Sequence, residues 1–366
     1  MTSGRSNAGQ YANLNIRSAM GSLTTNEWRV EKQTGFDGLH FSKNVPIPDL
    51  GPNDVLVRFH AASINYRDLI IATGEYRYPT NANIIPGSDG AGTVEATGSR
   101  VSRFHVGDKV ITLFNQGHHA GPLDQRSMKT ALGGLLDGTF RQRGVFSEEG
   151  LVAMPPNLSF LEASTLTCAG LTAWNALYGS ADHPLRPGDV VLTQGSGGVS
   201  LFGIQFAKAA GATVIATTSS DEKAVRLKEL GADHVINYKT TTDWGKTAKS
   251  LTPEKAGVSH ILEVGGPGTL RQSLAAIKIA GLITGIGYVS KSGDQPTLLE
   301  SFSAKCTVQS IVVGSRAQFE QMNRAVEAHN IHPVMDQKTF RLEDLKSAYQ
   351  YMSEQRHFGK VGIKID

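Results

Sequence analysis

The sequence predicts an α/β protein in which a doubly wound parallel domain is inserted into an antiparallel, barrel-like domain, and three observations support this. Between residues 28 and 154, short alternating segments such as 54–60 (DVLVRFH) are separated by Gly-Asp and Pro-Gly turns. From residue 189 to residue 329, β-rich segments alternate with helical patterns, which is typical of βαβ units. After Pro333 short elements return, so we expect the C-terminal segment, which ends in KVGIKID, to rejoin the first domain.

Hydrophobic periodicity places the individual elements. Besides 54–60, the barrel-like domain should contain strands at 91–96 and 109–114, and one late helix is expected at 342–354. In the inserted domain we expect, in chain order, strand 190–194, helix 199–210, strand 213–218, helix 221–230, strands 234–238 and 260–264, a helix after Gly268, strands 282–287 and 308–313, and a helix ending at His329.

Length and composition exclude several classes of protein. At ~150 residues per domain, 366 residues predict two domains, each with its own core. The formal net charge of +3, without any run of Lys or Arg longer than a pair, argues against a nucleic-acid partner. No window approaches the ~18 consecutive apolar residues of a membrane helix, and two cysteines are too few for a disulfide framework. We therefore expect a soluble, cytoplasmic protein that does not associate with a membrane.

The first twenty residues are polar and rich in Ser, Asn and Gly. They carry Arg5 and Arg17 without any acidic residue, which would also suit an organelle-targeting segment. Composition favours a disordered tail over residues 1–20.

A glycine-rich segment directly after the strand at 190–194 carries the strongest functional signal. Its residues, which lead into the helix at 199–210, are Gly195, Ser196, Gly197, Gly198, Val199 and Ser200. The glycines let the backbone turn tightly and approach a pyrophosphate, whose charge would face the helix N-terminus. Ser200 replaces the third glycine of the motif, so the helix should pack slightly less closely on the strand. Strand, turn and helix in register favour a nicotinamide dinucleotide site over a purely structural turn.

The end of the strand at 213–218 indicates which dinucleotide binds. An NAD enzyme would place Asp or Glu there to bind the ribose hydroxyls, whereas this chain has Ser219, Ser220 and Lys223. Hydroxyls, backbone amides and an ammonium suit a 2′-phosphate, which a carboxylate would repel. We therefore predict NADP(H). The alternative is that Ser220 only caps the helix that begins at Asp221.

Successive motifs of the chain resemble the medium-chain dehydrogenase/reductase superfamily. They are SINYRDL at 63–69, PGSDGAG at 86–92, VGDKV at 106–110, AGLTAW at 169–174 and GADHVINY at 231–238. The resemblance implies a GroES-like β-barrel catalytic domain formed by residues 21–165 and 331–366. Residues 166–330 would form the inserted Rossmann NADP-binding domain, and a cleft between two such domains is where cofactor and substrate usually meet.

The same resemblance argues against a metal. Where zinc alcohol dehydrogenases have a Cys and a His, this chain has Asn65 and Ser88, and only Cys168 matches a third ligand. One thiolate cannot form a zinc site, and the adjacent His118 and His119 are interpreted as a solvated loop pair. The chain thus resembles the zinc-free quinone oxidoreductase and zinc-type alcohol dehydrogenase-like branch, and we predict no metal.

The resemblance also implies roles for single residues. Asn65 matches a residue that contacts the nicotinamide region, the alternative being a turn-stabilising amide. Tyr76 matches a tyrosine that places or protonates an enolate, the alternative being an aromatic lid on the barrel. Tyr66, Arg67 and Asp68 are expected to line the substrate side, the alternative being a structural ion pair between Arg67 and Asp68. Further implied cofactor contacts are Thr172, Tyr238, Gly265, Gly266, Ile286, Gly287, Val313 and Gly314.

Together these features predict an NADPH-dependent, zinc-independent oxidoreductase that reduces an activated C=C, in an enone or quinone, of a small hydrophobic carbonyl compound. The alternatives are a metal-free alcohol dehydrogenase or ketone reductase, and an NADPH-binding protein without turnover or recruited to a redox-neutral biosynthetic step. A homodimer is expected through the edge of the Rossmann sheet at 309–313. Fold and kinship alone do not fix the substrate of such a protein.

Overall fold

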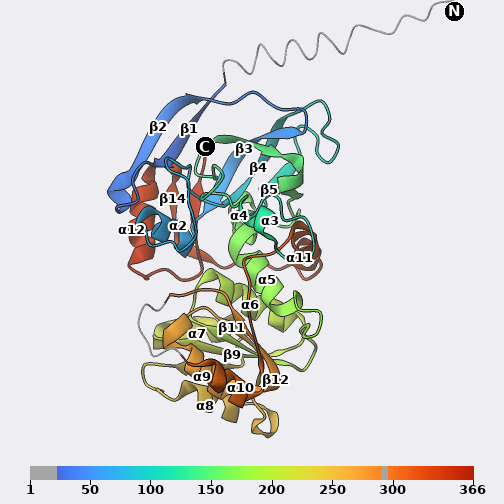
Figure 1. The fold of residues 1–366 in the computed structure, drawn as a ribbon, viewed down its shortest axis with the longest axis vertical. Coiled ribbons are helices and arrows are strands. Elements are labelled where there is room, and N and C mark those ends of the chain that lie inside the picture. Colours follow the sequence, from blue (N-terminus) through green and yellow to red (C-terminus); the bar gives the residue numbers. More distant parts are fainter. Residues whose placement is uncertain (1–22, 290–295) are drawn as a thin grey trace, which may run out of the picture.

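The computed structural model describes residues 23–289 and 296–366, so the predicted tail at 1–20 lies outside the described residues. The protein has two halves, each built on its own sheet (Figure 1). One half contains a seven-stranded sheet and the other a six-stranded sheet. Within the described ranges, no helix is long and apolar enough to cross a membrane.

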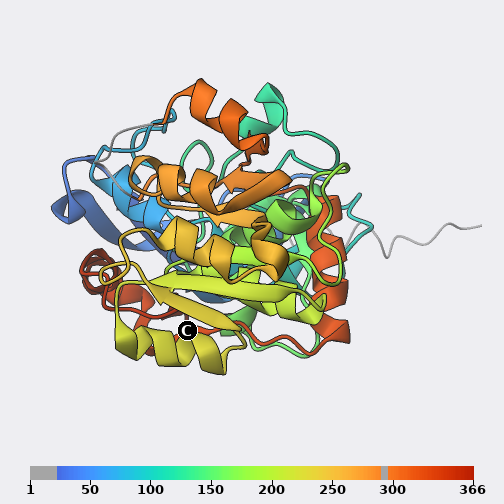
Figure 2. The same cartoon turned by 90° about the horizontal axis from the view of Figure 1, so that it is seen from below.

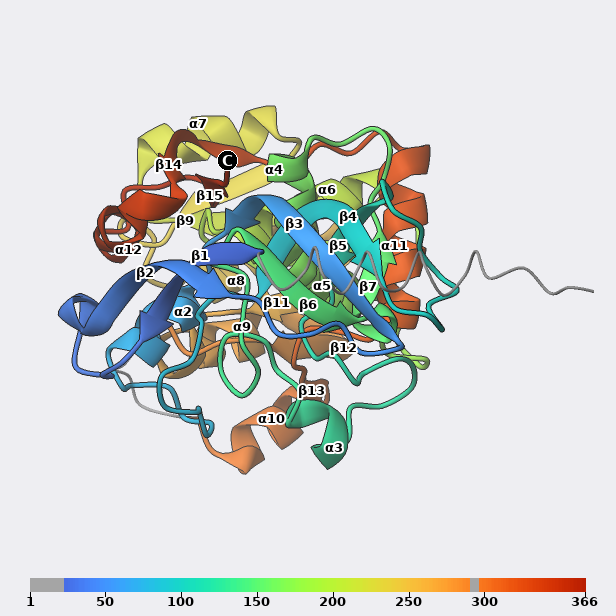
Figure 3. The same ribbon diagram turned by 90° about the horizontal axis from the view of Figure 1, so that it is seen from above.

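The barrel-like half is antiparallel except at its C-terminal strand pair. Its sheet runs in the order β14-β15-β3-β4-β5-β7, with β6 also paired to β3, and β1 and β2 form a separate antiparallel pair (Figure 3). These strands are β1 (Thr24–Val30), β2 (Leu39–Pro46), β3 (Asp54–Ser63), β4 (Asp89–Thr97), β5 (Lys109–Thr112), β6 (Arg143–Ser147), β7 (Leu151–Ala153), β14 (Met335–Arg341) and β15 (Lys360–Lys364).

The C-terminal segment does return to the first half, as the sequence predicts. Strand β15 pairs antiparallel with β3, and Ile363 lies opposite Ala62. Strand β14, which the sequence did not single out, pairs parallel with β15. The short helical elements of this half are η1 (Phe36–Gly38), α2 (Tyr66–Ala72), α3 (Gln125–Met128), η2 (Glu148–Gly150), α4 (Phe160–Ser164), η6 (Leu342–Asp344) and α12 (Leu345–Ser353).

The other half is a doubly wound parallel sheet. Its strand order is β10-β9-β8-β11-β12-β13, and every neighbouring pair is parallel. The order reverses between β8 and β11, and ligands of such sheets bind at this reversal, beyond the carboxyl ends of the strands. The strands are β8 (Val190–Gln194), β9 (Thr213–Thr218), β10 (His234–Asn237), β11 (Val258–Glu263), β12 (Ile277–Gly285) and β13 (Thr307–Ser310).

Helices cover both faces of this sheet (Figure 2). On one face, Val191 and Val214 pack with Phe202 of α6, and on the other, Leu192 and Ile215 pack with Trp244 of α8. The helical elements of this half are η3 (Leu166–Gly170), α5 (Leu171–Tyr178), α6 (Gly198–Ala209), α7 (Asp221–Glu229), α8 (Trp244–Ser250), η4 (Pro253–Lys255), η5 (Gly266–Gly268), α9 (Leu270–Ala276), α10 (Leu298–Ala304) and α11 (Arg316–Ala328).

Some predicted boundaries need correction. The strand expected at 282–287 begins already at Ile277. The strand expected at 308–313 ends at Ser310, and Val313 has a φ of 51°, a left-handed conformation that cannot continue a strand. The helix expected at 342–354 begins as the 3-10 turn η6 and becomes α-helical only at Leu345.

Candidate active site

The predicted phosphate loop joins β8 to the first turn of α6, which begins at Gly198. Gly195 has a φ of 76°, a conformation that side-chain-bearing residues rarely adopt. A Cβ atom added at Gly195 or Gly197 would meet no atom within 4 Å, so the space above the loop is open. Free space beside the N-terminus of a twelve-residue helix is what a pyrophosphate requires.

Ser200 and Gly203 share the role of the third glycine in the motif. The Ser200 hydroxyl is buried and donates to the Gln194 carbonyl, 2.6 Å away. The close approach of helix to strand falls at Gly203, where a Cβ would lie 2.7 Å from Leu262 Cδ2. Gly203 was not predicted as a site residue, although a glycine inside an apolar helix pattern is the signal that marks such a contact.

The C-terminal segment docks under the same loop. The Gly359 amide donates to the Ser196 carbonyl at 3.0 Å, and the two segments form an isolated bridge between Gly197 and Gly359. A Cβ at Gly198 would lie 2.5 Å from Cδ of Lys360. The phosphate loop therefore packs directly on the side chain of Lys360, the first residue of β15.

At the end of β9, Ser220 caps α7 by accepting from the Lys223 amide, as the structural alternative predicted. The Lys223 ammonium donates to the carbonyls of Gln355, at 3.3 Å, and His357, at 3.1 Å, and burial lowers the pKa of Lys223. Tyr238, which follows β10, is exposed and its amide donates to the Thr218 carbonyl at 2.9 Å. These predicted residues thus lie around the ends of two adjacent strands.

The remaining predicted cofactor residues follow β11, β12 and β13. The amides of Gly265 and Gly266 donate to Glu263 Oε1 at 3.0 and 2.9 Å, and Gln194 Nε2 donates to the other oxygen at 2.7 Å. This buried Gln194–Glu263 pair ties the loop after β11 to the end of β8, and the sequence analysis missed it. Parallel strands place their carboxyl ends on one edge, so the structure brings together Gly195–Val199 of the phosphate loop with Gly265, Gly266, Ile286, Gly287, Val313 and Gly314.

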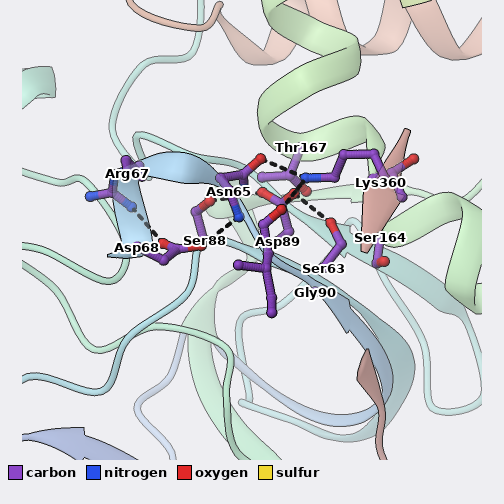
Figure 4. A network of polar contacts seen from close by, with 12 residues as sticks. Ser63, Asn65, Arg67, Asp68, Ser88, Asp89, Gly90, Ser164, Thr167 and Lys360 are labelled. Atoms are coloured by element: carbon purple, nitrogen blue, oxygen red, sulfur yellow. Dashed lines mark hydrogen bonds and ion pairs between the residues drawn. The ribbon is translucent and has the colours of Figure 1, made fainter. Parts of the chain in front are cut away.

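A buried polar network lies where the phosphate loop meets the barrel (Figure 4). The Lys360 Nζ donates to Ile64 O at 2.8 Å, to Asn65 Oδ1 at 2.5 Å and to Asp89 Oδ2 at 3.2 Å. Three acceptors match the three N–H bonds of an ammonium. The Lys360 and Asp89 side chains are 4% and 0% exposed, so this is a buried ion pair. Asp89 also accepts from the hydroxyls of Ser63 and Ser88, each at 2.7 Å.

This network fixes the orientation of the Asn65 amide. Because Oδ1 accepts from Lys360, Nδ2 must point away from it. Asn65 Nδ2 is buried and has no hydrogen-bond partner among the described residues. The Asn65 backbone amide also stabilises the start of α2 by donating to Asp68 Oδ2 at 2.8 Å. An unpaired buried donor costs ~1–3 kcal/mol, which a ligand oxygen would recover.

The residues at the positions of zinc ligands do not fit a zinc ion. Asn65 and Asp89 face the Lys360 ammonium, and the Ser88 hydroxyl donates to Asp89. Burial, together with the nearby Asp89 carboxylate, raises the pKa of the Cys168 thiol to about 12, so it does not supply a thiolate at neutral pH. No cluster of three His, Cys, Asp or Glu residues suited to a metal occurs in the described part of the chain.

The histidine pair in the 115–121 loop differs from the prediction. His118 is buried and its Nε2 lies 2.9 Å from the Gly121 carbonyl, whereas His119 is exposed. Of the two histidines, only His119 is therefore exposed to solvent. His118 is enclosed because its backbone carbonyl accepts from the Arg316 amide, which holds the loop against α11.

Tyr76 lines a pocket beside the network. Arg67, Tyr78, Phe114 and Asn115 line the same pocket. The ring centroid of Tyr76 lies 5.4 Å from Arg67 Cζ, and the ring packs edge-on against Tyr78. The structure thus places Tyr76 next to Arg67, which is two residues from Asn65 in the chain. Thr172, a predicted nicotinamide contact, is buried on α5.

Comparison with known proteins agrees with the fold. Residues 51–156 match the alcohol dehydrogenase GroES-like domain, and residues 198–328 match the zinc-binding dehydrogenase family. A zinc-type alcohol dehydrogenase-like protein of Schizosaccharomyces pombe is 44% identical over 337 residues, which cover 91% of this chain and 97% of that protein. A 2-haloacrylate reductase of a Burkholderia species is 27% identical over 352 residues, 91% of this chain and 96% of that enzyme.

A solved structure is also similar to this chain. The putative alcohol dehydrogenase of Sinorhizobium meliloti 1021 superposes with a TM-score of 0.84 and 38% identity, covering 93% of this chain and 98% of that one. A GroES-like barrel joined to a dinucleotide-binding sheet defines an oxidoreductase of the alcohol dehydrogenase type. The chain belongs to the medium-chain dehydrogenase/reductase superfamily.

Proposed function

We propose that this chain is a cytoplasmic, NADPH-dependent and zinc-independent oxidoreductase that reduces the activated C=C of a small α,β-unsaturated carbonyl compound. The observation that carries the proposal is the Asn65 amide, whose buried Nδ2 has no partner among the described residues while its oxygen accepts from the Lys360 ammonium. Such a preoriented donor suits an oxygen on which negative charge develops.

The reaction needs two new bonds to the substrate. A hydride adds to the β-carbon, the C=C electron pair moves toward the carbonyl oxygen, and a proton then reaches the α-carbon. NADPH, when held by the loops at the carboxyl edge of β8, β9, β11, β12 and β13, would supply the hydride. Asn65 Nδ2 would donate to the enolate oxygen, and the Lys360 charge on the other side of the amide would strengthen that bond. Tyr76, on the pocket wall, would place the enolate or supply the proton.

Zinc independence rests on the charge already present at the site. The Lys360 ammonium contacts Asn65 and Asp89, so a divalent cation there would face an adjacent positive charge. We expect protein purified without a histidine tag to contain far less than one zinc per chain by elemental analysis. Stoichiometric zinc that survives dialysis would contradict this part of the proposal.

The preference for NADPH rests on Ser219, Ser220 and Lys223 at the end of β9. Asp221, the nearest acid, is engaged by Asn237 Nδ2 at 2.8 Å. We expect Lys223→Ala to weaken NADPH binding by about tenfold, the effect of one charge-assisted hydrogen bond, and to leave NADH binding nearly unchanged. Titration of cofactor fluorescence measures both dissociation constants. Lys228→Ala, an exposed charge at the far end of α7, is the matched control, and wild-type protein that binds NADH as tightly as NADPH would refute the preference.

A substrate panel separates C=C reduction from its alternatives. NADPH oxidation should occur with a small enone or quinone and should be much slower with the corresponding saturated ketone. Activity confined to simple ketones or alcohols would favour a metal-free alcohol dehydrogenase. Tight NADPH binding without oxidation across the panel would favour a binding protein, and product formation without NADPH would favour a redox-neutral step.

We also propose a homodimer formed through the edge of the parallel sheet. Strand β13 is the edge strand, and the adjacent α10 exposes Leu298, Leu299 and Phe302. Three large apolar side chains on one short exposed helix suit a protein interface. We expect light scattering to give twice the chain mass for the wild type and the single mass for Phe302→Glu. A monomeric wild type at micromolar concentration would contradict the proposal.

A further inference from the structure

We propose that the pocket beside Asn65 binds a carboxylate through Arg67, so that the substrate is a short unsaturated carboxylic acid rather than a neutral enone. This inference rests on the proposed function, which it refines by naming the substrate class.

Among the residues that the structure describes, one nitrogen of the Arg67 guanidinium has an acceptor and the other two lack one. Nη1 donates to the Leu132 carbonyl at 2.7 Å and lies 3.9 Å from Asp68 Oδ1, the ion pair that the structural alternative predicted. The side chain is only 10% exposed. Its Nε and Nη2 atoms are buried and make no hydrogen bond of good geometry among the described residues. The Tyr76 side chain lies close enough to favour the charged guanidinium, but without the geometry that would satisfy these two donors. Two unpaired donors on a buried charged group are costly, so this arrangement calls for an acceptor.

The two free nitrogens have the geometry of a carboxylate site. Nε–H and the neighbouring Nη2–H lie on the same edge of the guanidinium plane and point in parallel directions. This edge binds both oxygens of a carboxylate at once, which a single carbonyl oxygen cannot match. The rings of Phe114 and Tyr76, with centroids 4.6 and 5.4 Å from Arg67 Cζ, restrict the orientation of that plane.

The pocket has a charge compatible with a carboxylate. A Cβ at Gly134 would lie 2.9 Å from Arg67 Nη2, so only a glycine at this position lets the guanidinium lie so close to the backbone. Asn115 Nδ2, a further buried donor of the same pocket, is also unpaired within the described residues. None of the described residues that line the pocket is acidic, and most are apolar or aromatic. Burial opposes the charge of Arg67, but Tyr76 and Asp68 beside it outweigh burial and raise its pKa, so the guanidinium stays charged.

Binding to Arg67 would also make an unsaturated carboxylate easier to reduce. A carboxylate accepts electrons poorly because it is already negative. When Arg67 neutralises it, hydride can add to the β-carbon while the C=C pair moves onto the carboxylate oxygens, and the α-carbon then takes a proton. The C=C becomes a C–C single bond, and NADPH is the reductant, as in the proposed function.

The test measures binding and turnover separately, in the NADPH-bound protein. Butanoate, which has no double bond, is the binding probe, and butanamide is the neutral probe of equal size. We expect Arg67→Gln to weaken butanoate binding about 10- to 100-fold and to change butanamide binding far less. Arg100→Gln, an exposed arginine of the same domain, is the matched control. Gly134→Ala keeps the charge but crowds Nη2, so it should also weaken butanoate binding, and it replaces Arg67→Gln if that variant does not fold.

The outcomes distinguish the two proposals. If the wild type oxidises NADPH with butenone but binds butanoate no better than butanamide, the carboxylate site is refuted and the proposed function stands. If neither butenone nor 2-butenoate is reduced while butanoate binds in an Arg67-dependent manner, the site stands and the proposed function fails. Equal butanoate affinity in the wild type, Arg67→Gln and Gly134→Ala overturns the inference.

Discussion

Replacing Lys360 by methionine is expected to lower the free energy of unfolding by about 3–5 kcal/mol, the cost of removing one partner from a buried ion pair. Asp89 is fully buried and would lose the ammonium that lies 3.2 Å from its carboxylate. The hydroxyls of Ser63 and Ser88 would still donate to it, but hydroxyl dipoles do not neutralise a buried carboxylate. Urea unfolding followed by tryptophan fluorescence measures the change.

Two further variants isolate the ion pair. Lys364→Met removes the exposed lysine of the same strand, β15, and should cost less than ~0.5 kcal/mol. Lys360→Met combined with Asp89→Asn removes both charges and should recover much of the lost stability, because no unpaired charge then remains buried. If Lys360→Met lowers the free energy of unfolding no more than Lys364→Met does, the ammonium of Lys360 is not needed to balance a buried charge on Asp89.

The burial of Lys360 could not be predicted from the sequence. Strand alternation places residues 360 and 364 on the same face of β15, so the pattern predicts similar exposure for both lysines. One is buried and the other exposed because the phosphate loop packs over the start of the strand, with Gly198 against the Lys360 stem. That contact joins residues more than 160 positions apart in the chain, and no local pattern encodes it.

Other parts of the site could be predicted, because they depend on residues that are consecutive in the chain. The segment at Gly195–Val199 was found because strand, glycines and helix are consecutive, and parallel topology then places the loops after the other strands beside it. The Gln194–Glu263 pair and the unsatisfied edge of Arg67 depend on distant partners, or on their absence, and so needed the structure. His118 was misjudged for the same reason, since the enclosure of its loop comes from contact with α11.

Replacing Asn65 by aspartate is expected to lower kcat for enone reduction by about 10²- to 10³-fold, the usual cost of removing one preoriented donor from an oxyanion site. Aspartate keeps the size of the side chain and an oxygen for Lys360, but it replaces the free N–H donor by a negative oxygen. That oxygen would repel the enolate as its charge develops. Because the donor acts mainly in the transition state, KM should change much less than kcat.

The measurement combines steady-state kinetics with cofactor titration. NADPH affinity should stay within about threefold of the wild type, since the residues proposed to hold the dinucleotide lie at the carboxyl edge of the parallel sheet. Asn53→Asp makes the same chemical change at an exposed site of the same domain and should leave kcat unaltered. If Asn65→Asp keeps the wild-type kcat, the amide is only a turn-stabilising group, and the enolate oxygen must be bound elsewhere. If kcat and NADPH affinity fall together, Asn65 acts by placing the cofactor and not by stabilising charge on the substrate.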